Sequence, residues 1–195
     1  AGTMLSAITD NAIDLTNIVE DLLTAARAQM GSLTIIPDSV ALRPLISRVV
    51  ESSSGTAHHV VVNGPSATVL ADESRVRQIL RNLISNAQRY GGHQIHIATQ
   101  LDRRHVSIRV SDNGDGIPQN DQERIFAPYE SAHDAGTQPG SLGLGLTISR
   151  SLARLMGGDL SYQRHDGWTT FDLRLPLLVT QVPDAAEPAV ELEPV

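Results

Sequence analysis

The chain has 195 residues, of which 41% are hydrophobic, enough for one buried core with a helix or a tail to spare. Its formal net charge of -7 excludes a general nucleic-acid binder, because such proteins present a basic surface. The sequence contains no cysteine, which excludes disulfides, thiolate metal sites and cysteine nucleophiles. It contains no lysine either, so a cationic contact to phosphate must come from arginine. No apolar run approaches the roughly 18 residues that a membrane-spanning helix needs.

We expect three segments: a helix over residues 1–31, a compact domain over 32–178, and an acidic, proline-rich, disordered tail over 179–195. In the helix, apolar residues recur at alternating spacings of three and four, which is a heptad seam: Leu5, Ile8, Ala12, Leu15, Val19, Leu22 and Ala26. Gly31 supplies a natural stop. A heptad seam needs a partner helix, so the pattern predicts a coiled coil. The alternative is an amphipathic helix that packs on its own domain.

The domain mixes helical and strand-like periodicities. Asp72 is a good N-cap for a helix over 73–90, which the pair Gly91-Gly92 ends. The other expected elements are an extended stretch at 33–40, helices at 42–50 and 147–156, and strands at 59–63, 68–71, 95–101, 106–110, 160–162 and 171–175. Half-buried alternating strands imply a sheet with helices over one face. The sequence therefore predicts an α+β fold, a two-layer α/β sandwich.

The helix over 73–90 carries a polar stripe. Asn82 and Asn86 are four residues apart and share one face, with Arg89 close to a turn further on. An amide oxygen is a suitable ligand for Mg²⁺, and a guanidinium suits an anion. The alternative is an ordinary solvated face, but asparagine is a poor helix former. Two asparagines in mid-helix therefore favour a binding role.

Two glycine-containing stretches follow. Asp112 continues the alternation of Val106, Ile108 and Val110, so its side chain should point inward. An adenine amino group there would satisfy the hydrogen-bonding capacity of the carboxylate. The alternative for 112–118 is a plain turn. The second stretch, 140–146, precedes a helix, so its backbone N–H groups are free to hold phosphate, although it is also compatible with a flexible loop. The stretch 140–146 does not fit a dinucleotide-binding fingerprint, because that motif directly follows a strand and here a loop is expected before it.

In this order, the motifs resemble the four boxes of the sensor histidine kinases. The matching stretches are the N box at Asn82–Tyr90, the first glycine box at Asp112–Gly116, the F box at Ile125–Tyr129 and the second glycine box at Gly140–Leu146. The helix over 1–31 resembles the second helix of the dimerisation and phosphotransfer hairpin of that family. The resemblance covers about Leu5 to Leu175, and it implies a histidine kinase ATPase-like fold with a mixed, mostly antiparallel sheet.

The resemblance also implies the ligands, ATP and Mg²⁺, and a role for each matching residue. Asn86 would coordinate Mg²⁺, Asn82 would support the triphosphate, and Asp112 would recognise the adenine amino group. Arg89 stands where the family often has lysine, and Tyr90 would flank the nucleotide. The remaining expected nucleotide contacts are Gly114, Gly116, Ile117, Ser141, Leu142, Gly143, Leu144, Gly145 and Leu146. Residues 131–139 would form the loop that covers ATP.

The sequence departs from the family in three places. Leu142 replaces a small hydroxyl residue, for which Ser141 is a substitute one position earlier, and residues 131–139 contain no arginine. The acceptor histidine is missing, because none of the seven histidines lies in a heptad helix. We therefore expect a piece of a protein-histidine kinase that does not autophosphorylate without its acceptor helix. Its expected partners are the histidine-bearing helix of the parent protein, a response regulator receiver domain and, in the full-length protein, a second copy. The expected location is cytoplasmic, with a membrane anchor in the parent left open.

Fold alone does not fix the reaction, since gyrase-type and chaperone-type ATPases share it. Those relatives carry a glutamate general base where this chain has Asn82, and an amide cannot accept a proton at neutral pH. This favours phosphoryl transfer over hydrolysis. One alternative is a non-catalytic nucleotide-binding interaction module. Another is an anti-sigma-type serine kinase, against which the heptad helix counts.

Overall fold

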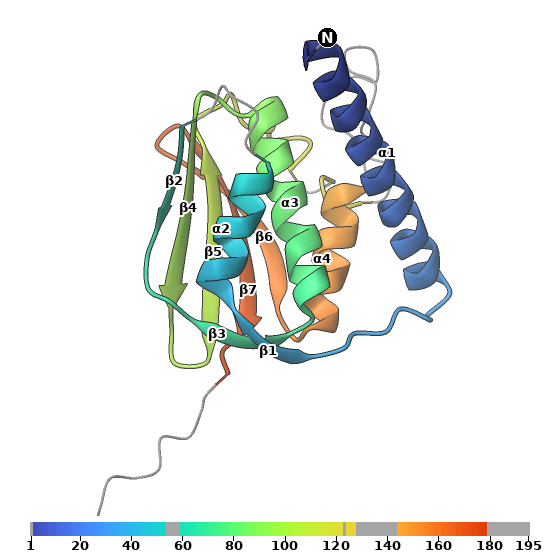
Figure 1. Cartoon of the computed structure of the whole chain (residues 1–195). Helices are drawn as coiled ribbons and strands as arrows, with labels where there is room; N and C mark the ends of the chain where they lie inside the picture. Colours follow the sequence, from blue (N-terminus) through green and yellow to red (C-terminus); the bar gives the residue numbers. More distant parts are fainter. Residues whose placement is uncertain (1, 54–58, 123, 128–143, 179–195) are drawn as a thin grey trace, which may run out of the picture.

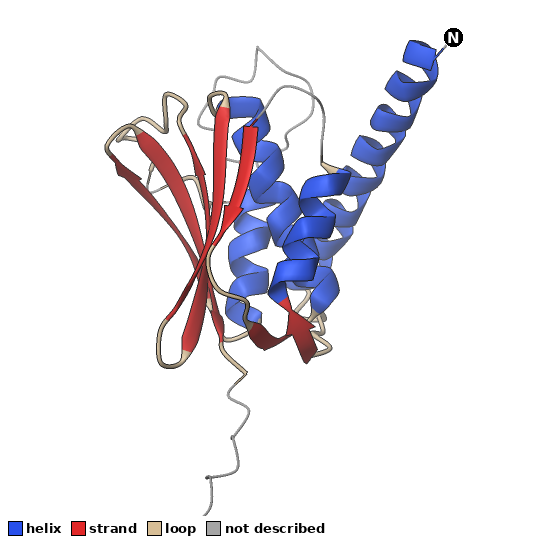
Figure 2. Ribbon diagram, turned by 60° about the vertical axis from the view of Figure 1, so that its left-hand side comes forward, coloured by secondary structure: helices blue, strands red, loops and turns tan. Residues whose placement is uncertain are grey.

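The computed structural model describes residues 2–53, 59–122, 124–127 and 144–178. Its domain has two layers, a twisted five-stranded sheet and three helices packed on one face of it (Figure 1, Figure 2). The strands of the sheet are β2 (His59–Asn63), β4 (Gln94–Leu101), β5 (His105–Asp112), β6 (Asp159–His165) and β7 (Trp168–Pro176). The helices are α2 (Leu42–Ser52), α3 (Glu73–Tyr90) and α4 (Gly145–Leu155). The predicted two-layer α+β sandwich is confirmed.

The strand order is β2-β4-β5-β7-β6. Only β2 and β4 run parallel among these strands, so the sheet is mixed and mostly antiparallel, as the resemblance implied. A second, two-stranded antiparallel sheet joins β1 (Asp38–Ala41) to β3 (Thr68–Ala71) beneath the helices (Figure 1). The pairing of these two short strands was not predicted, because neither has enough residues to show a pattern.

The core lies between the sheet and the helices. In β5, every second residue is buried, and the buried series Val106, Ile108 and Val110 ends at Asp112. Facing them, α3 buries a stripe at helical spacing that includes Val76, Ile79, Leu80 and Leu83. Removing such apolar side chains from water is the main driving force for the fold. The alternation therefore carries a carboxylate to the edge of an apolar core.

Asp72 fixes where α3 begins. Its Oδ1 accepts hydrogen bonds from the backbone N–H groups of Ser74 and Arg75 at 3.0 and 3.3 Å, and its Oδ2 accepts one from Ile36 N at 3.1 Å. The predicted N-cap is therefore confirmed, and it also ties the chain before β1 to the start of the helix. Burial opposes the charge, but the hydrogen bonds from Ser74, Ile36 and Arg75 hold the pKa of Asp72 below its usual value.

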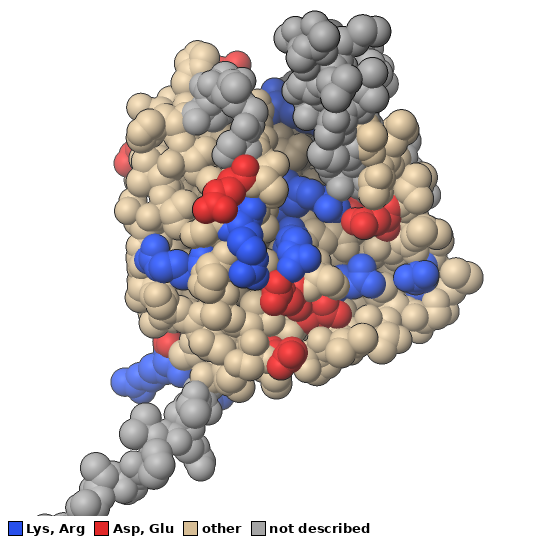
Figure 3. Space-filling model, viewed as in Figure 1, with Lys and Arg blue, Asp and Glu red and all other residues tan. Residues whose placement is uncertain are grey.

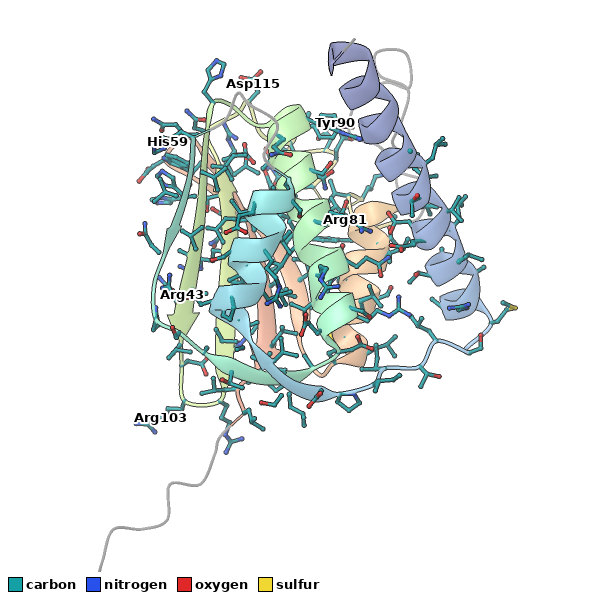
Figure 4. The ribbon with its side chains drawn as sticks, viewed as in Figure 1. Arg43, His59, Arg81, Tyr90, Arg103 and Asp115 are labelled. Atoms are coloured by element: carbon teal, nitrogen blue, oxygen red, sulfur yellow. The ribbon has the colours of Figure 1, made fainter. Side chains whose placement is uncertain are left out.

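The helix α1 (Gly2–Gln29) lies beside α3 and α4, and polar side chains join it to α3. Gln78 Nε2 on α3 donates to Asp21 Oδ1 at 2.8 Å, Arg81 pairs with Glu20 at 3.2 Å, and the adjacent Thr24 is buried. Figure 4 shows Arg81 on the side of α3 that faces α1. Arginine and acidic side chains also meet across the exposed helical face (Figure 3).

The heptad seam of α1 points away from these contacts. Leu15, Val19 and Leu22 are 63%, 53% and 44% exposed, whereas Thr24 is only 4% exposed. The seam residues Leu5 and Ile8 have side chains outside the described part of the structure. The domain therefore leaves the described part of the seam uncovered, and the alternative of a seam packed on its own domain does not hold for those residues.

Candidate functional site

Chain segments that carry the predicted motifs come together towards one end of the domain. The last turn of α3 and the end of β5 lie there, and α4 begins further down, beside the middle of α3, where Gly145 faces Asn82 (Figure 1). Figure 4 shows Tyr90, at the end of α3, and Asp115, in the loop after β5, at this same end. The predicted residues from the first two motifs are thus brought together with the start of α4.

Asp112 is the buried carboxylate of this site. It is only 6% exposed, and its Oδ1 accepts a hydrogen bond from Gly114 N at 3.0 Å. Its Oδ2 accepts no hydrogen bond from any residue that the structure describes. Burial raises the pKa of Asp112 above its usual value, although the Gly114 N–H and the positive charge of Arg164 oppose the shift. A buried acceptor with an unused oxygen is suited to an amino group on a ligand.

The loop after β5 packs against the end of α3 without room for side chains. A Cβ on Gly91 would lie 2.7 Å from Cβ of Asp112, and one on Gly114 would lie 2.7 Å from Cα of Gly91. Non-bonded carbon atoms essentially never approach this closely, so both positions require glycine. The two glycines bring the backbone of the loop directly onto the end of the helix, beside Asp112.

The two asparagines of α3 share a face but have different contacts. Asn82 Nδ2 donates to Ser149 Oγ on α4 at 2.9 Å, and a Cβ on Gly145 would lie 2.9 Å from Asn82 Cγ. Asn82 is therefore held against the start of α4. Asn86 is half-buried and its side-chain amide makes no hydrogen bond to any described residue, so this amide is available to a ligand.

The helix α4 begins at Gly145, two residues before the predicted start at Thr147. Its N-cap residue, Leu144, is buried and offers no side-chain hydrogen bond to the first N–H groups. Thr147 Oγ1 in the first turn is also buried without a partner among the described residues. Unpaired donors at a helix N-terminus favour an anion there. Leu146 is half-buried and packs against the core, where it anchors this turn.

The remaining predicted contacts surround these groups. Arg89 and Tyr90 lie in the last turn of α3, and both are exposed. Ile117 packs against the core and donates its N–H to Tyr162 Oη at 3.3 Å. Gly116 has a φ of +80°, a conformation that favours glycine. Three predicted contacts, the predicted covering loop and the tail lie outside the described part of the chain: Ser141, Leu142, Gly143, 131–139 and 179–195.

The motif at 125–129 is described only in its first three residues. Ile125 is buried, and the guanidinium of Arg150 on α4 lies 4.6 Å from the ring centre of Phe126. This is a cation–π contact, and it fixes the motif against the same helix whose N-terminus forms part of the site. Pro128 and Tyr129 fall outside the described residues.

Sequence reasoning missed three side chains that hold the site together. Ser149 binds Asn82, and Thr169 and Arg164 form a row with Asp112 across β5, β7 and β6. Arg164 donates to the carbonyl of Gly114 and to Thr169 Oγ1. The alternation of β6 could have placed Arg164 on the helical side of the sheet, but the strand register that brings it to Asp112 is a tertiary property.

Comparison with known proteins gives the family and the fold of the chain. The family model described as "Histidine kinase-, DNA gyrase B-, and HSP90-like ATPase" matches residues 71–179. The virulence sensor protein BvgS of Bordetella pertussis is 34% identical over 92% of this chain, which spans only 16% of that protein's length. The histidine kinase AdeS of Acinetobacter baumannii superposes with a TM-score of 0.71 at 20% identity, covering 91% of this chain and 86% of that one. Full-length ShkA in complex with AMPPNP gives a TM-score of 0.70 at 27% identity, covering 90% of this chain and 38% of that one.

The fold and the site define a nucleotide-binding domain of the ATPase superfamily that includes kinases, gyrases and chaperones. The chain belongs to the histidine kinase-, DNA gyrase B- and HSP90-like ATPase family, as a catalytic domain of the sensor histidine kinase type. Among the described residues, no helix has the length and apolar character needed to cross a bilayer.

Proposed function

We propose that this chain binds ATP with Mg²⁺ and transfers the γ-phosphoryl group to a histidine on a helix of its parent protein, for relay to a response regulator. The observation that carries the proposal is the buried Asp112, with one oxygen held by Gly114 and the other without a described partner. An exocyclic amino group of adenine is a donor of the right kind for that oxygen. Guanine would present a carbonyl oxygen at the equivalent ring position and would be repelled.

We assign Mg²⁺ to Asn86. Its amide has no described hydrogen-bond partner, and it lies one helical turn from Asn82, which is fixed to α4. The described residues contain no group of three or more His, Cys, Asp or Glu side chains that could hold a metal ion by themselves. A metal bound by one amide together with phosphate oxygens and water suits Mg²⁺, which prefers few protein ligands. When bound, Mg²⁺ would neutralise charge on the phosphates.

The phosphate end of the site is assigned to the start of α4. Gly145 and the following N–H groups supply donors, and Asn82 lies directly beside Gly145. Asn82 cannot take a proton from water, which supports transfer to a presented side chain and not rapid hydrolysis. In this mechanism, a histidine nitrogen attacks the γ-phosphorus in line, the bond from that phosphorus to the β,γ-bridging oxygen breaks, and ADP leaves. The residues of this chain contribute position and hydrogen bonds.

We further propose that residues 1–31 are the second helix of the dimerisation and phosphotransfer hairpin, followed by the catalytic domain at 32–178 and the tail at 179–195. The exposed apolar seam at Leu15, Val19 and Leu22 supports a helical partner. That partner would be the histidine-bearing helix, packed within a homodimer of the parent protein. The location would be cytoplasmic.

A non-catalytic nucleotide-binding module is the second candidate. It is favoured by Leu142, which replaces the usual small hydroxyl residue, and by the absence of arginine from 131–139. Both candidates predict binding of ATP, so only transfer separates them.

Transfer is tested with two purified proteins. The chain is mixed with Mg²⁺, γ-labelled ATP and a hairpin that joins residues 1–31 to a histidine-bearing helix of the parent protein. Label on the hairpin that is lost in acid and retained in base identifies phosphohistidine. A hairpin with glutamine in place of the histidine should take no label, and neither should the wild-type hairpin when mixed with Asn86→Ala. If ATP binds but the hairpin remains unlabelled, the chain is a binding module and the kinase proposal is wrong.

A further inference from the structure

Arg164, at the end of β6, reaches the first glycine loop. Its Nη1 and Nη2 both donate to the carbonyl oxygen of Gly114 at 3.2 Å, and Nη1 also donates to Thr169 Oγ1 at 2.9 Å. The guanidinium fills the space next to Gly116, where a Cβ would lie 2.6 Å from Cζ of Arg164. Three chain positions, Gly114, Gly116 and Thr169, surround this one planar group, which makes the contact a built feature of the loop.

The strand register explains how β6 reaches the loop. Asp112 on β5 pairs with Thr169 on β7, and Thr169 pairs with Arg164 on β6. Arg164 also continues the alternation of Leu160 and Tyr162 on the helical side of the sheet. The three residues of the row therefore lie on one face, with the hydroxyl of Thr169 between the carboxylate and the guanidinium.

Gly114 is held from both sides as a result. Its N–H donates to Asp112 Oδ1, and its carbonyl oxygen accepts from both terminal nitrogens of Arg164. Fixing the peptide groups on both sides of a glycine removes the freedom that this residue otherwise has. A two-pronged contact of this kind needs the planar guanidinium, because an ammonium group is a single point donor.

We propose that Arg164 is a positioning residue for the nucleotide base: it fixes Gly114 so that the loop leaves the second oxygen of Asp112 open to the adenine amino group. This inference rests on the proposed function, because it assumes that adenine binds at Asp112. It assigns Arg164 to the base end of the site and not to the phosphates, which are assigned to the start of α4. The remote position of Arg164 in sequence explains why no motif contains it.

The test compares Arg164→Met, Arg164→Lys and the control Arg174→Met. Arg174 belongs to the same sheet and pairs with Asp102 at 2.7 Å, far from the loop in the strand register, and Arg174→Met makes the same change in charge as Arg164→Met. Each protein is titrated with ADP, a non-hydrolysable ATP analogue and the matching GTP analogue, all with Mg²⁺. The fluorescence of Trp168, the only tryptophan, and thermal melting check that each variant is folded.

Arg164→Met should bind ADP and the ATP analogue about tenfold more weakly, the size expected when a charge-assisted hydrogen bond is lost. The loss of affinity should be the same for ADP and for the ATP analogue, and the preference for the ATP analogue over the GTP analogue should fall. Arg164→Lys should recover less than half of the loss on a logarithmic scale, and Arg174→Met should bind as wild type. Unchanged affinity in Arg164→Met, or a loss that grows with the number of phosphates, would overturn the proposal.

A readout without nucleotide separates this inference from the proposed function. In Arg164→Met, the amide of Gly114 should exchange with solvent faster, and carbon NMR should show a higher pKa for the Asp112 carboxyl, because the nearby positive charge is gone. If neither property changes, Arg164 does not position the loop. If both change but the wild type binds no nucleotide, the proposed function fails and the positioning role stands without the base.

Discussion

Asn82 on α3 is joined to Ser149 on α4 by a hydrogen bond of 2.9 Å from Nδ2 to Oγ. Ser149 is buried, and Gly145, one turn earlier on α4, lies against the same amide. The contact links the helix that carries the N box to the helix that follows the second glycine box. The relative position of these two helices sets the space between Asn86 and the N–H groups at the start of α4.

Gly145→Ala tests this link. The added Cβ would overlap the amide of Asn82, so the variant should unfold at a lower temperature, with a loss of about 1–3 kcal/mol that is typical of overpacking. In an Asn82→Ala background, the same substitution should be neutral or stabilising, because the obstruction is gone and alanine favours a helix. Thermal melts of the four proteins give the coupling. Additive effects would show that Gly145 and Asn82 are independent.

Asp112→Asn should separate stability from binding. Because burial raises the pKa of Asp112, the charged form destabilises the fold at neutral pH, and the uncharged amide should raise the melting temperature of the nucleotide-free protein. The wild type should gain the same stability as the pH falls through the raised pKa of Asp112. The melting temperatures of the wild type and the variant should therefore converge in acid. Affinity for the ATP analogue should fall at least tenfold in the variant, since the acceptor charge is lost. A variant that is less stable at pH 7 would contradict the assignment.

Gln78→Ala should loosen α1. The substitution removes the 2.8 Å hydrogen bond to Asp21, a carboxyl whose pKa burial already raises above its usual value. Leaving such a group without its donor costs about 1–3 kcal/mol. Hydrogen exchange over residues 18–28 should accelerate, while exchange in β5 remains unchanged. Arg77→Ala is the control, because Arg77 pairs with Glu73 on α3 itself.

The ion pairs of Asp159 predict an acid-sensitive contact between α4 and β6. Arg150 and Arg154 each donate to Asp159 Oδ1 at 3.0 Å, and Arg150 above all lowers the pKa of Asp159 to about 2. A depressed pKa stabilises the fold above the ordinary value near 4 and loses that contribution as the pH falls towards 2. Asp159→Asn should therefore melt below the wild type at pH 7 and together with it near pH 2. A difference that persists at pH 2 would have to come from packing.

Much of the fold was predictable because its signals are local. The alternation of β5 predicted the inward direction of Asp112, and the capping preference of aspartate predicted the start of α3 at Asp72. The N box asparagines were predicted to share a face, which their spacing requires. These features depend on periodicity or on one residue and its neighbours, so a single sequence contains them.

The features that could not be predicted depend on register and on which helices touch. Nothing local to Arg164 indicates that β7 places it in a row with Asp112. Ser149 lies on α4, and packing alone decides that α4 meets α3. The start of α4 is at Gly145 and not at the predicted Thr147, because the N-cap is the buried Leu144 and no polar capping residue marks the position in the sequence. The open side of α1 follows from the polar contacts at Asp21 and Thr24, which the apolar seam does not reveal.

The most direct test of the central claim is a calorimetric titration with a non-hydrolysable ATP analogue and Mg²⁺. Wild type, Asn86→Ala and Asp112→Ala are compared, with Arg174→Met as a surface control. We predict saturable binding by wild type and control, a loss of most of the affinity in both site variants, and a loss in Asn86→Ala that shrinks when Mg²⁺ is omitted. Absence of binding by the wild type up to millimolar ligand, or equal affinity in all four proteins, would contradict the account.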